Sequence, residues 1–257
     1  MILAVDVGNT ETVVGLFEDV TPLSTWRLAT DSRRTADEIH LYLRGFLSEA
    51  AEAGFAAPER LIVASVVPVL NRSWSGAGER AGLGTVFLTG ESALPIRLDV
   101  DRPAEVGADR IANTLAAATL YGSDTIVVDL GTATTFDCVT GDGVFIGGVI
   151  APGPVALDQL TRATAQLPKV ALGPPERVIG RNTLDCLRSG GFYTVVDSID
   201  GIVDRIIEEW RPDEPVVVAT GGLAEVVGRY CRTVAKIEPA LTITGLAIAD
   251  RTLRGPS

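Results

Sequence analysis

Lysine is nearly absent from this sequence, and this limits how the protein can bind phosphate. The only lysines are Lys169, in LPKV, and Lys236, in VAKIEP, although lysine and arginine together number 22. A Walker-type phosphate loop needs a lysine directly after a glycine-rich turn. Neither lysine follows such a turn, so any ATP site in this chain must neutralise phosphate charge by other means.

Histidine and cysteine are also scarce. The single histidine, His40, shares a predicted polar helix face with Asp37 and Arg44, which is typical of a solvated side chain. Catalysis by histidine, including a Ser-His-Asp triad, is therefore not expected. The cysteines are widely separated and lack metal-ligand spacing, so we expect buried, reduced thiols without a functional role. They are Cys138, Cys186 and Cys231.

The chain lacks an excess of positive charge and lacks long apolar runs. Its net charge of −11 disfavours nucleic-acid and anionic-membrane partners, which are bound through lysine and arginine. No apolar run reaches the roughly 18 residues of a membrane span, and the start MILAVDVGNT has no signal-peptide pattern. We therefore expect a cytoplasmic protein that acts on a small molecule.

What the chain does contain is an order of predicted elements that occurs twice. At 257 residues with 46% apolar content it is long enough for two domains. In the first half we predict a three-strand meander, a helix that begins with a capping box at Thr35 and Glu38, and two further strands. The predicted ranges are 2–8, 10–18 and 23–30 for the meander, 35–47 for the helix, and 60–68 and 84–89 for the last strands.

The second half repeats this pattern after an alanine-rich helix predicted at 107–122. A second meander is followed by two helices, a strand and a terminal helix. The predicted ranges are 124–131, 132–140 and 143–153, then 153–166, 182–209, 215–222 and 241–253. We therefore expect an α/β fold with two similar domains, residues 1–112 and 113–257, and a cleft between them.

A matching acidic motif follows the first strand of each meander. DVGNTETV begins at Asp6 and DLGTATT at Asp129, each with a glycine two residues later. Tight turns of this kind present backbone amides and hydroxyls to phosphate oxygens, and carboxylates bind Mg²⁺. A single copy is more often an ordinary hairpin with an Asx turn, but two copies in matching positions favour a paired phosphate site. Thr10, Thr132 and Thr135 are the candidate hydroxyls.

Two further stretches, VGADR and GAGERA, resemble functional motifs. In VGADR, Asp109 and Arg110 fall in the first turn of a helix, where Asp109 is either a favourable end charge or a base for a substrate hydroxyl; composition does not choose between these. GAGERA, from Gly76, imitates a dinucleotide fingerprint but does not follow a strand, so we interpret it as surface.

Taken together, these motifs resemble the type III pantothenate kinases, a branch of the actin, sugar kinase and Hsp70 superfamily. The resemblance runs in the family's order from DVGNT through DRPAEVGADR, VVDLGTATTFD, GGVIAPG, VIGRNT and VVATGG to LTITGLAI. It implies duplicated actin-like ATPase (ribonuclease H-like) domains with a nucleotide cleft between them. It also implies ATP-dependent phosphorylation of pantothenate to 4′-phosphopantothenate, the first step of coenzyme A biosynthesis.

The resemblance also implies roles for individual residues. ATP would contact the first loop and Thr132, with ATGG near the adenosine, and the first-loop residues are Asp6, Val7, Gly8, Asn9, Thr10, Glu11, Thr12 and Val13. Pantothenate would lie against Gly107, Ala108, Asp109 and Arg110, with Asp109 as the general base. Asp6 and Asp129 would belong to the cation sites for Mg²⁺ and for K⁺ or NH₄⁺.

Members of the family are homodimers in which the neighbouring subunit completes the substrate pocket, and Thr183 matches the residue that reaches across. The apolar stripe from Val195 to Ile207 is either part of that contact or a buried core helix. This chain departs from the family at Val100 and Arg102, and Glu11 adds a negative charge to the phosphate loop that we expect to point into solvent.

Two alternatives therefore stay open at this point. One is a kinase for another small alcohol, because the departures lie near the expected substrate mouth. The other is a non-catalytic, nucleotide-binding regulator of the same fold, since a fold alone does not establish function.

Overall fold

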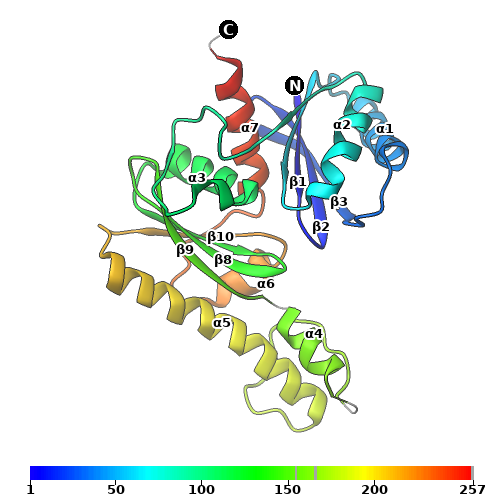
Figure 1. Cartoon of the computed structure of the whole chain (residues 1–257). Coiled ribbons are helices and arrows are strands. Elements are labelled where there is room, and N and C mark those ends of the chain that lie inside the picture. Colours follow the sequence, from blue (N-terminus) through cyan, green and yellow to red (C-terminus); the bar gives the residue numbers. More distant parts are fainter. Residues whose placement is uncertain (154, 165–166, 256–257) are drawn as a thin grey trace. The chain divides into compact units, whose positions relative to one another are not determined.

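The computed structural model describes residues 1–153, 155–164 and 167–255. The chain forms two compact units, of which unit 1 comprises Met1–Ala116 with Thr242–Ser257 and unit 2 comprises Ala117–Leu241. Each unit contains its own β-sheet with helices packed on it (Figure 1). No helix among the described residues is both long and apolar enough to cross a membrane.

The sheet of unit 1 has the strand order β3-β2-β1-β4-β5. β1 pairs antiparallel with β2, and β2 with β3, whereas β1, β4 and β5 run parallel. These strands are β1 (Ile2–Val7), β2 (Glu11–Glu18), β3 (Thr21–Ala29), β4 (Arg60–Ser65) and β5 (Gly84–Phe87). The predicted meander and the two later strands of this half are thus confirmed.

Four helices and three shorter elements complete this part of the chain. They are α1 (Ala36–Glu52), α2 (Asn71–Arg80), α3 (Ala108–Tyr121), α7 (Leu241–Arg254), β6 (Arg97–Leu98) and the 3-10 turns η1 (Pro68–Leu70) and η2 (Pro103–Glu105). The predicted capping box is present at the start of α1. Thr35 Oγ1 accepts a hydrogen bond from Glu38 N, and Thr35 N donates to Glu38 Oε2 at 2.8 Å.

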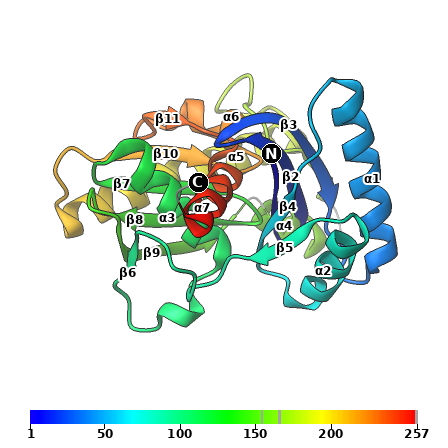
Figure 2. The same ribbon diagram turned by 90° about the horizontal axis from the view of Figure 1, so that it is seen from above.

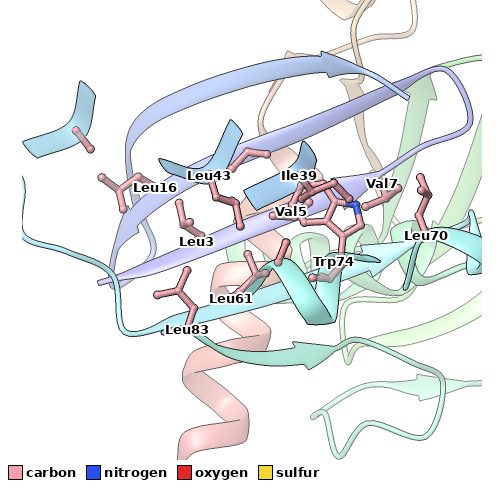
Figure 3. Packing of buried hydrophobic residues seen from close by; sticks show 14 residues of the cluster. Leu3, Val5, Val7, Leu16, Ile39, Leu43, Leu61, Leu70, Trp74 and Leu83 are labelled. Carbon is pink, nitrogen blue, oxygen red and sulfur yellow. The ribbon is translucent and has the colours of Figure 1, made fainter. Parts of the chain in front are cut away.

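One face of the unit 1 sheet packs against α1 and α2. Alternate residues of β1, namely Leu3, Val5 and Val7, point to this face and are fully buried. In Figure 3 their side chains meet those of α1 and α2, including Leu43 and Trp74. Because side chains alternate along a strand, the intervening residues of β1 must point to the other face.

The other face of the sheet is held to α7 by a buried ion-pair group. The Asp250 side chain is fully buried and lies 3.2 Å from Arg60 Nε of β4 and 2.7 Å from Arg254 Nη2. A buried carboxylate is costly without such partners. Gly15 of β2 leaves room for Ile243, whose Cδ1 atom would lie 3.0 Å from a Cβ at that glycine.

These contacts correct the expected division of the chain. We expected one continuous domain over 113–257, but residues 242–257 belong to unit 1. The reason is long-range packing, because α7 also contacts α3: Thr242 Oγ1 donates to Asn113 Oδ1 at 2.9 Å, and a Cβ on Gly245 would lie 2.1 Å from Ala112 O. The terminal helix itself was predicted correctly from its apolar pattern.

The strands of unit 2 reproduce the pairing seen in unit 1. β7, β8 and β9 form an antiparallel meander, and β10 runs parallel to β7 and to β11. The strands of this sheet that belong to unit 2 are β7 (Thr125–Leu130), β8 (Ala133–Val139), β9 (Val144–Pro152), β10 (Val216–Thr220) and β11 (Lys236–Ile237). The predicted repeat of the meander is therefore confirmed, with β7 in the position that β1 has in unit 1.

The remaining elements of unit 2 are helical. They are α4 (Val155–Arg162), α5 (Thr183–Trp210), α6 (Ala224–Val227) and the 3-10 turn η3 (Gly228–Tyr230). Part of the helix predicted at 153–166 falls outside the described residues, at 154, 165 and 166. Figure 1 and Figure 2 show α5 as the long helix of this unit, and α4 approaches it where a Cβ on Gly191 would lie 2.7 Å from Leu157 Cδ2.

The apolar stripe of α5 belongs to the core of unit 2. Val196, Ile199 and Val203 are buried with Phe192 against the strand residues of β7, and Val195, Ile202, Ile206 and Ile207 pack around them. Of the two interpretations left open for this stripe, the structure therefore favours the core helix over an exposed subunit contact.

Candidate active site

The direction of Asp6 follows from side-chain alternation along β1. Because Val5 and Val7 point into the core with α1 and α2, Asp6 points to the opposite face of the sheet, at the carboxyl end of the strand. The chain then turns tightly: Gly8 N donates to Glu11 O at 3.0 Å, and a Cβ on Gly8 would lie 2.8 Å from that oxygen. Only glycine fits this turn without moving the backbone.

The predicted phosphate loop has an exposed tip and a buried base. Asn9, Thr10 and Glu11 are exposed, whereas Val7 and Thr12 are buried. Thr12 Oγ1 is 2.8 Å from Thr30 Oγ1, on the core side of the sheet. Val7 and Thr12 can therefore offer a nucleotide only backbone groups, and the side chains available for contact are those at the tip.

Asp109 lies at the same end of the unit 1 sheet as this loop. A Cβ on Gly107 would lie 2.4 Å from Asp109 Oδ1 and 3.6 Å from Val66 Cγ1, and Val66 N donates to Val7 O at 3.1 Å. These contacts connect the start of α3 to the carboxyl ends of β4 and β1. Unit 1 thus brings the proposed base and the first loop together at one end of its sheet.

The environment of Asp109 suits a proton acceptor. Its side chain is half-buried, and burial raises the pKa of its carboxyl group, while the hydrogen bond from Arg110 N to Oδ1, at 2.8 Å, opposes that rise. A higher pKa makes a carboxylate a stronger base. Ala108 is buried and Arg110 half-buried beside it, and Thr114 Oγ1 donates to Arg110 O at 2.8 Å.

Asp129 is oriented in unit 2 by the same alternation. Val128 and Leu130 point into the core with α5, so Asp129 points to the other face of the sheet. The strand register places Thr135 of β8 and Thr220 of β10 on either side of it on that face. Thr134 is buried, whereas the candidate residue Thr135 is only partly buried.

Two glycines that follow strands shape the surroundings of the Asp129 loop. Gly221 has φ of 88°, and a Cβ there would lie 2.4 Å from Asp129 Oδ1 and 2.9 Å from Leu130 N. A Cβ on Gly153 would lie 2.3 Å from Thr132 O, in the exposed turn between β7 and β8. In the sequence, the motifs ATGG and GGVIAPG stand out only as parts of the family resemblance, because a close approach of distant backbone segments leaves no local sequence pattern.

The surroundings of Asp129 fit a cation bound through oxygen atoms. Thr220 Oγ1 is buried and has no hydrogen-bond partner among the described residues, and it lies on the neighbouring strand at the register of Asp129. Within the described part of the chain, no cluster of three or more His, Cys, Asp or Glu residues is placed to hold a metal ion. A cation here would therefore take further ligands from water or substrate phosphates, as Mg²⁺ usually does.

Thr183 is the first residue of α5 in unit 2 and is exposed. The preceding Asn182 caps this helix: its Oδ1 accepts from Asp185 N at 2.9 Å and its Nδ2 donates to Asp185 Oδ2 at 2.8 Å. The GRNT motif thus has a local structural function through Asn182. Exposed apolar side chains lie close in sequence, with Ile179 81% and Val178 66% exposed.

Two of the three residues that depart from the expected pattern take part in ion pairs. Arg102 forms an exposed ion pair with Glu105 at 3.0 Å, and Val100 is half-buried. Glu11 does not simply point into solvent as expected, because its carboxylate is paired with the guanidinium of Arg27 on β3.

The two dismissed features are placed differently from the expectation, although neither becomes a site. GAGERA forms the last part of α2 and its C-cap, Ala81, so it is not a dinucleotide turn, but Ala77 is buried in the core rather than on the surface. His40 is half-buried, and its Nδ1 atom has no hydrogen-bond partner among the described residues. The apolar face of α2 explains the first error.

Comparison with known proteins agrees with this geometry. The family model for type III pantothenate kinases matches residues 2–205 of this chain. A type III pantothenate kinase from Acidothermus cellulolyticus is 46% identical over 251 residues, covering 96% of this chain and 97% of that protein. The chain belongs to the type III pantothenate kinase family. The protein of that name from Frankia casuarinae is 44% identical over 251 residues, with 96% and 98% covered.

Solved structures support the fold assignment for this pantothenate kinase family member. An inorganic polyphosphate/ATP-glucomannokinase from Arthrobacter matches with a TM-score of 0.51 at 13% identity, and 96% of each chain is covered. At this identity the likeness concerns the fold alone. The α/β fold with two sheets is that of the sugar kinases and actin-like ATPases, as expected.

The contact between Gly221 and Asp129 can be tested with a matched pair of variants. Gly54 has φ of 84°, but a Cβ added there would meet no atom within 4 Å, so G54A adds only backbone strain of about 1–2 kcal/mol. G221A adds the same strain and a clash with backbone. We expect G221A to lose at least twice as much unfolding free energy as G54A, measured by urea denaturation. Equal losses would contradict the contact.

The raised pKa of Asp109 predicts how stability depends on pH. In the folded protein, Asp109 keeps its proton to a higher pH than it does in the unfolded chain. Its contribution to the free energy of unfolding is therefore fully present below about pH 4 and is lost as the pH rises through the raised pKa. Relative to wild type, D109N should therefore gain unfolding free energy as the pH rises above about 4, the ordinary pKa of an aspartate. D37N, which removes a carboxylate from the same position of α1, is the control. If the difference in unfolding free energy between D109N and wild type did not change with pH, the burial of the Asp109 carboxyl group would be contradicted.

Proposed function

We propose that this protein transfers the γ-phosphoryl group of ATP to the primary hydroxyl of pantothenate, forming 4′-phosphopantothenate for coenzyme A biosynthesis. The observation that carries the proposal is the position of Asp109 beside the end of β1, with a pKa raised by burial, in a chain of this family. Proton abstraction and charge neutralisation are the two demands of phosphoryl transfer to an alcohol.

In the proposed reaction, Asp109 accepts the proton of the pantothenate hydroxyl. The hydroxyl oxygen of pantothenate attacks the γ-phosphorus of ATP, and ADP leaves. Arg110, with Gly107 and Ala108, binds the substrate, and a guanidinium suits the pantothenate carboxylate. The amides and hydroxyls of the loop from Asp6 to Val13 and of Thr132 bind the phosphates. Turn amides supply the positive potential that a lysine supplies in a Walker loop.

Bound cations, when present, would lower the negative charge of the transferring phosphoryl group. We propose Asp6 and Asp129 as the cation ligands, Mg²⁺ as the divalent ion and K⁺ or NH₄⁺ as a monovalent ion near Asp129. The buried, unpartnered Thr220 hydroxyl among the described residues supports an oxygen-liganded ion on that face. Neutral hydroxyl and single carboxylate ligands suit a monovalent ion, which needs little negative charge.

We also propose that the enzyme acts as a homodimer and that Thr183 contacts the substrate bound by the neighbouring subunit. The exposed apolar residues close to it support a covering partner: Val178, Ile179 and Leu184. A protein that remains monomeric in sedimentation equilibrium would remove this part of the proposal. A cytoplasmic location, without nucleic-acid or membrane partners, is consistent with the net charge of −11.

The alternatives differ in which residues they need. A regulator could lose the base and keep the nucleotide turns, but this chain retains Asp6, Asp109, Arg110, Asp129 and Thr183. A kinase for another alcohol would keep all of them. Because Val100 and Arg102 are the departures from the family, a different alcohol is the runner-up.

The proposal predicts ADP release that depends on pantothenate, Mg²⁺ and K⁺. Replacing K⁺ by Na⁺ should abolish it, and D109N should lower kcat by roughly 10²–10⁴ while binding of ATP persists, because only proton transfer is lost. D37N, with its exposed first-turn carboxylate on α1, should keep the wild-type rate. Turnover of another alcohol in place of pantothenate would identify the runner-up, and no turnover of any alcohol would favour the regulator.

A further inference from the structure

We propose that Arg27 is a positioning residue for the nucleotide, which acts by neutralising Glu11 beside the phosphate loop. The inference rests on the proposed function, because it assumes that the loop from Asp6 to Val13 binds ATP. It concerns a residue outside that loop, on β3, which the phosphate-loop motif does not include.

The strand register places both side chains on the ligand face of the unit 1 sheet. Asp6 pairs with Val13, Val13 pairs with Arg27, and Glu11 pairs with Ala29. Residues paired across strands share a face, and so do residues two apart along a strand. Asp6, Glu11 and Arg27 therefore lie on one face, opposite the core formed with α1 and α2.

Arg27 and Glu11 are in direct contact. Arg27 Nη1 donates a hydrogen bond to Glu11 Oε2, and the two side chains are 42% and 45% exposed. Glu11 is the first residue of β2, and its carbonyl oxygen closes the Gly8 turn. The carboxylate is thus attached to the residue that shapes the loop, and the backbone that carries it is fixed beside the proposed phosphate site.

An unpaired carboxylate at this position would oppose ATP binding. Like charges a few ångströms apart repel even in water, and the repulsion grows as solvent is excluded by the ligand. The loop sequence DVGNTETV itself contains no lysine or arginine, so the cation must come from another strand. Pairing with Arg27 removes most of the negative field of Glu11 while leaving its backbone in place for the turn.

A competing explanation is that Arg27 binds the phosphates directly, with Glu11 only aligning it. The two explanations differ in the double variant. If Arg27 acts by neutralising Glu11, removing both charges restores ATP binding. If Arg27 itself contacts phosphate, E11Q/R27Q stays as weak as R27Q.

The experiment measures ATP KM and kcat, together with equilibrium binding of a non-hydrolysable ATP analogue, for wild type and for R27Q, E11Q, E11Q/R27Q and R27K. We expect R27Q to raise the ATP KM about tenfold with kcat within about twofold, and E11Q/R27Q to return to within about twofold of wild type. R27K keeps the charge and should lie between wild type and R27Q. The KM for pantothenate should not change.

R33Q is the matched control. It removes the same charge from a second exposed ion pair, Arg33 with Asp31 at 3.0 Å, just beyond the end of β3. Because exposed pairs contribute little to stability, all these variants should remain folded by circular dichroism. R33Q should leave the ATP KM within about twofold, which separates a local effect from a change in net charge.

The outcomes separate this inference from the proposed function. An unchanged ATP KM in R27Q, or a double variant as weak as R27Q, overturns the role of Arg27. If the wild type turns over no pantothenate, the proposed function fails, and binding of the ATP analogue to the same variants then decides the inference alone. Restored analogue binding in E11Q/R27Q supports it in either case.

Discussion

The alternation of side chains along β1 and β7 is the constraint on which the site depends. Each strand inserts every second residue into a core with helices, through Val5 and Val7 in unit 1 and Val128 and Leu130 in unit 2. Asp6 and Asp129 are consequently forced to the opposite face, at the end of the strand where a glycine turn begins. The hydrophobic effect that builds each core thus also aims each carboxylate, and a shift of one residue in register would bury the acid and expose a valine.

Close approach of backbone then defines the ligand side of both loops. Gly8 in unit 1 and Gly221 with Gly153 in unit 2 stand where a Cβ would meet a backbone or carboxylate oxygen at less than 3 Å. The available groups are amides, hydroxyls and single carboxylates. This explains how a chain with two lysines can be built for phosphate chemistry: turn geometry and bound cations can replace a fixed ammonium group, provided that no local carboxylate stays unpaired.

Features encoded in short segments were predictable from the sequence, and features made by distant contacts were not. Both meanders, the Thr35 capping box and the helix that begins at Ala108 have local patterns, and the structure contains them. The return of α7 to unit 1 depends on Asp250 meeting Arg60, about 190 positions apart, for which no local pattern exists. The same holds for Gly221 against Asp129 and for Arg27 against Glu11, where strand register decides the contact.

The two loops are duplicates in backbone but not in charge, and this difference has a consequence for the fold around them. In DLGTATT, no charged residue follows Asp129, and the polar side chains are threonine hydroxyls. The neighbours of Asp129 on the ligand face, Thr135 and Thr220, are also neutral. DVGNTET adds Glu11, so the unit 1 sheet must supply a compensating cation from an adjacent strand, and the register of β3 puts Arg27 there. The arginine across the sheet is therefore needed only while the residue at position 11 carries a negative charge, which makes the requirement for Arg27 a consequence of Glu11.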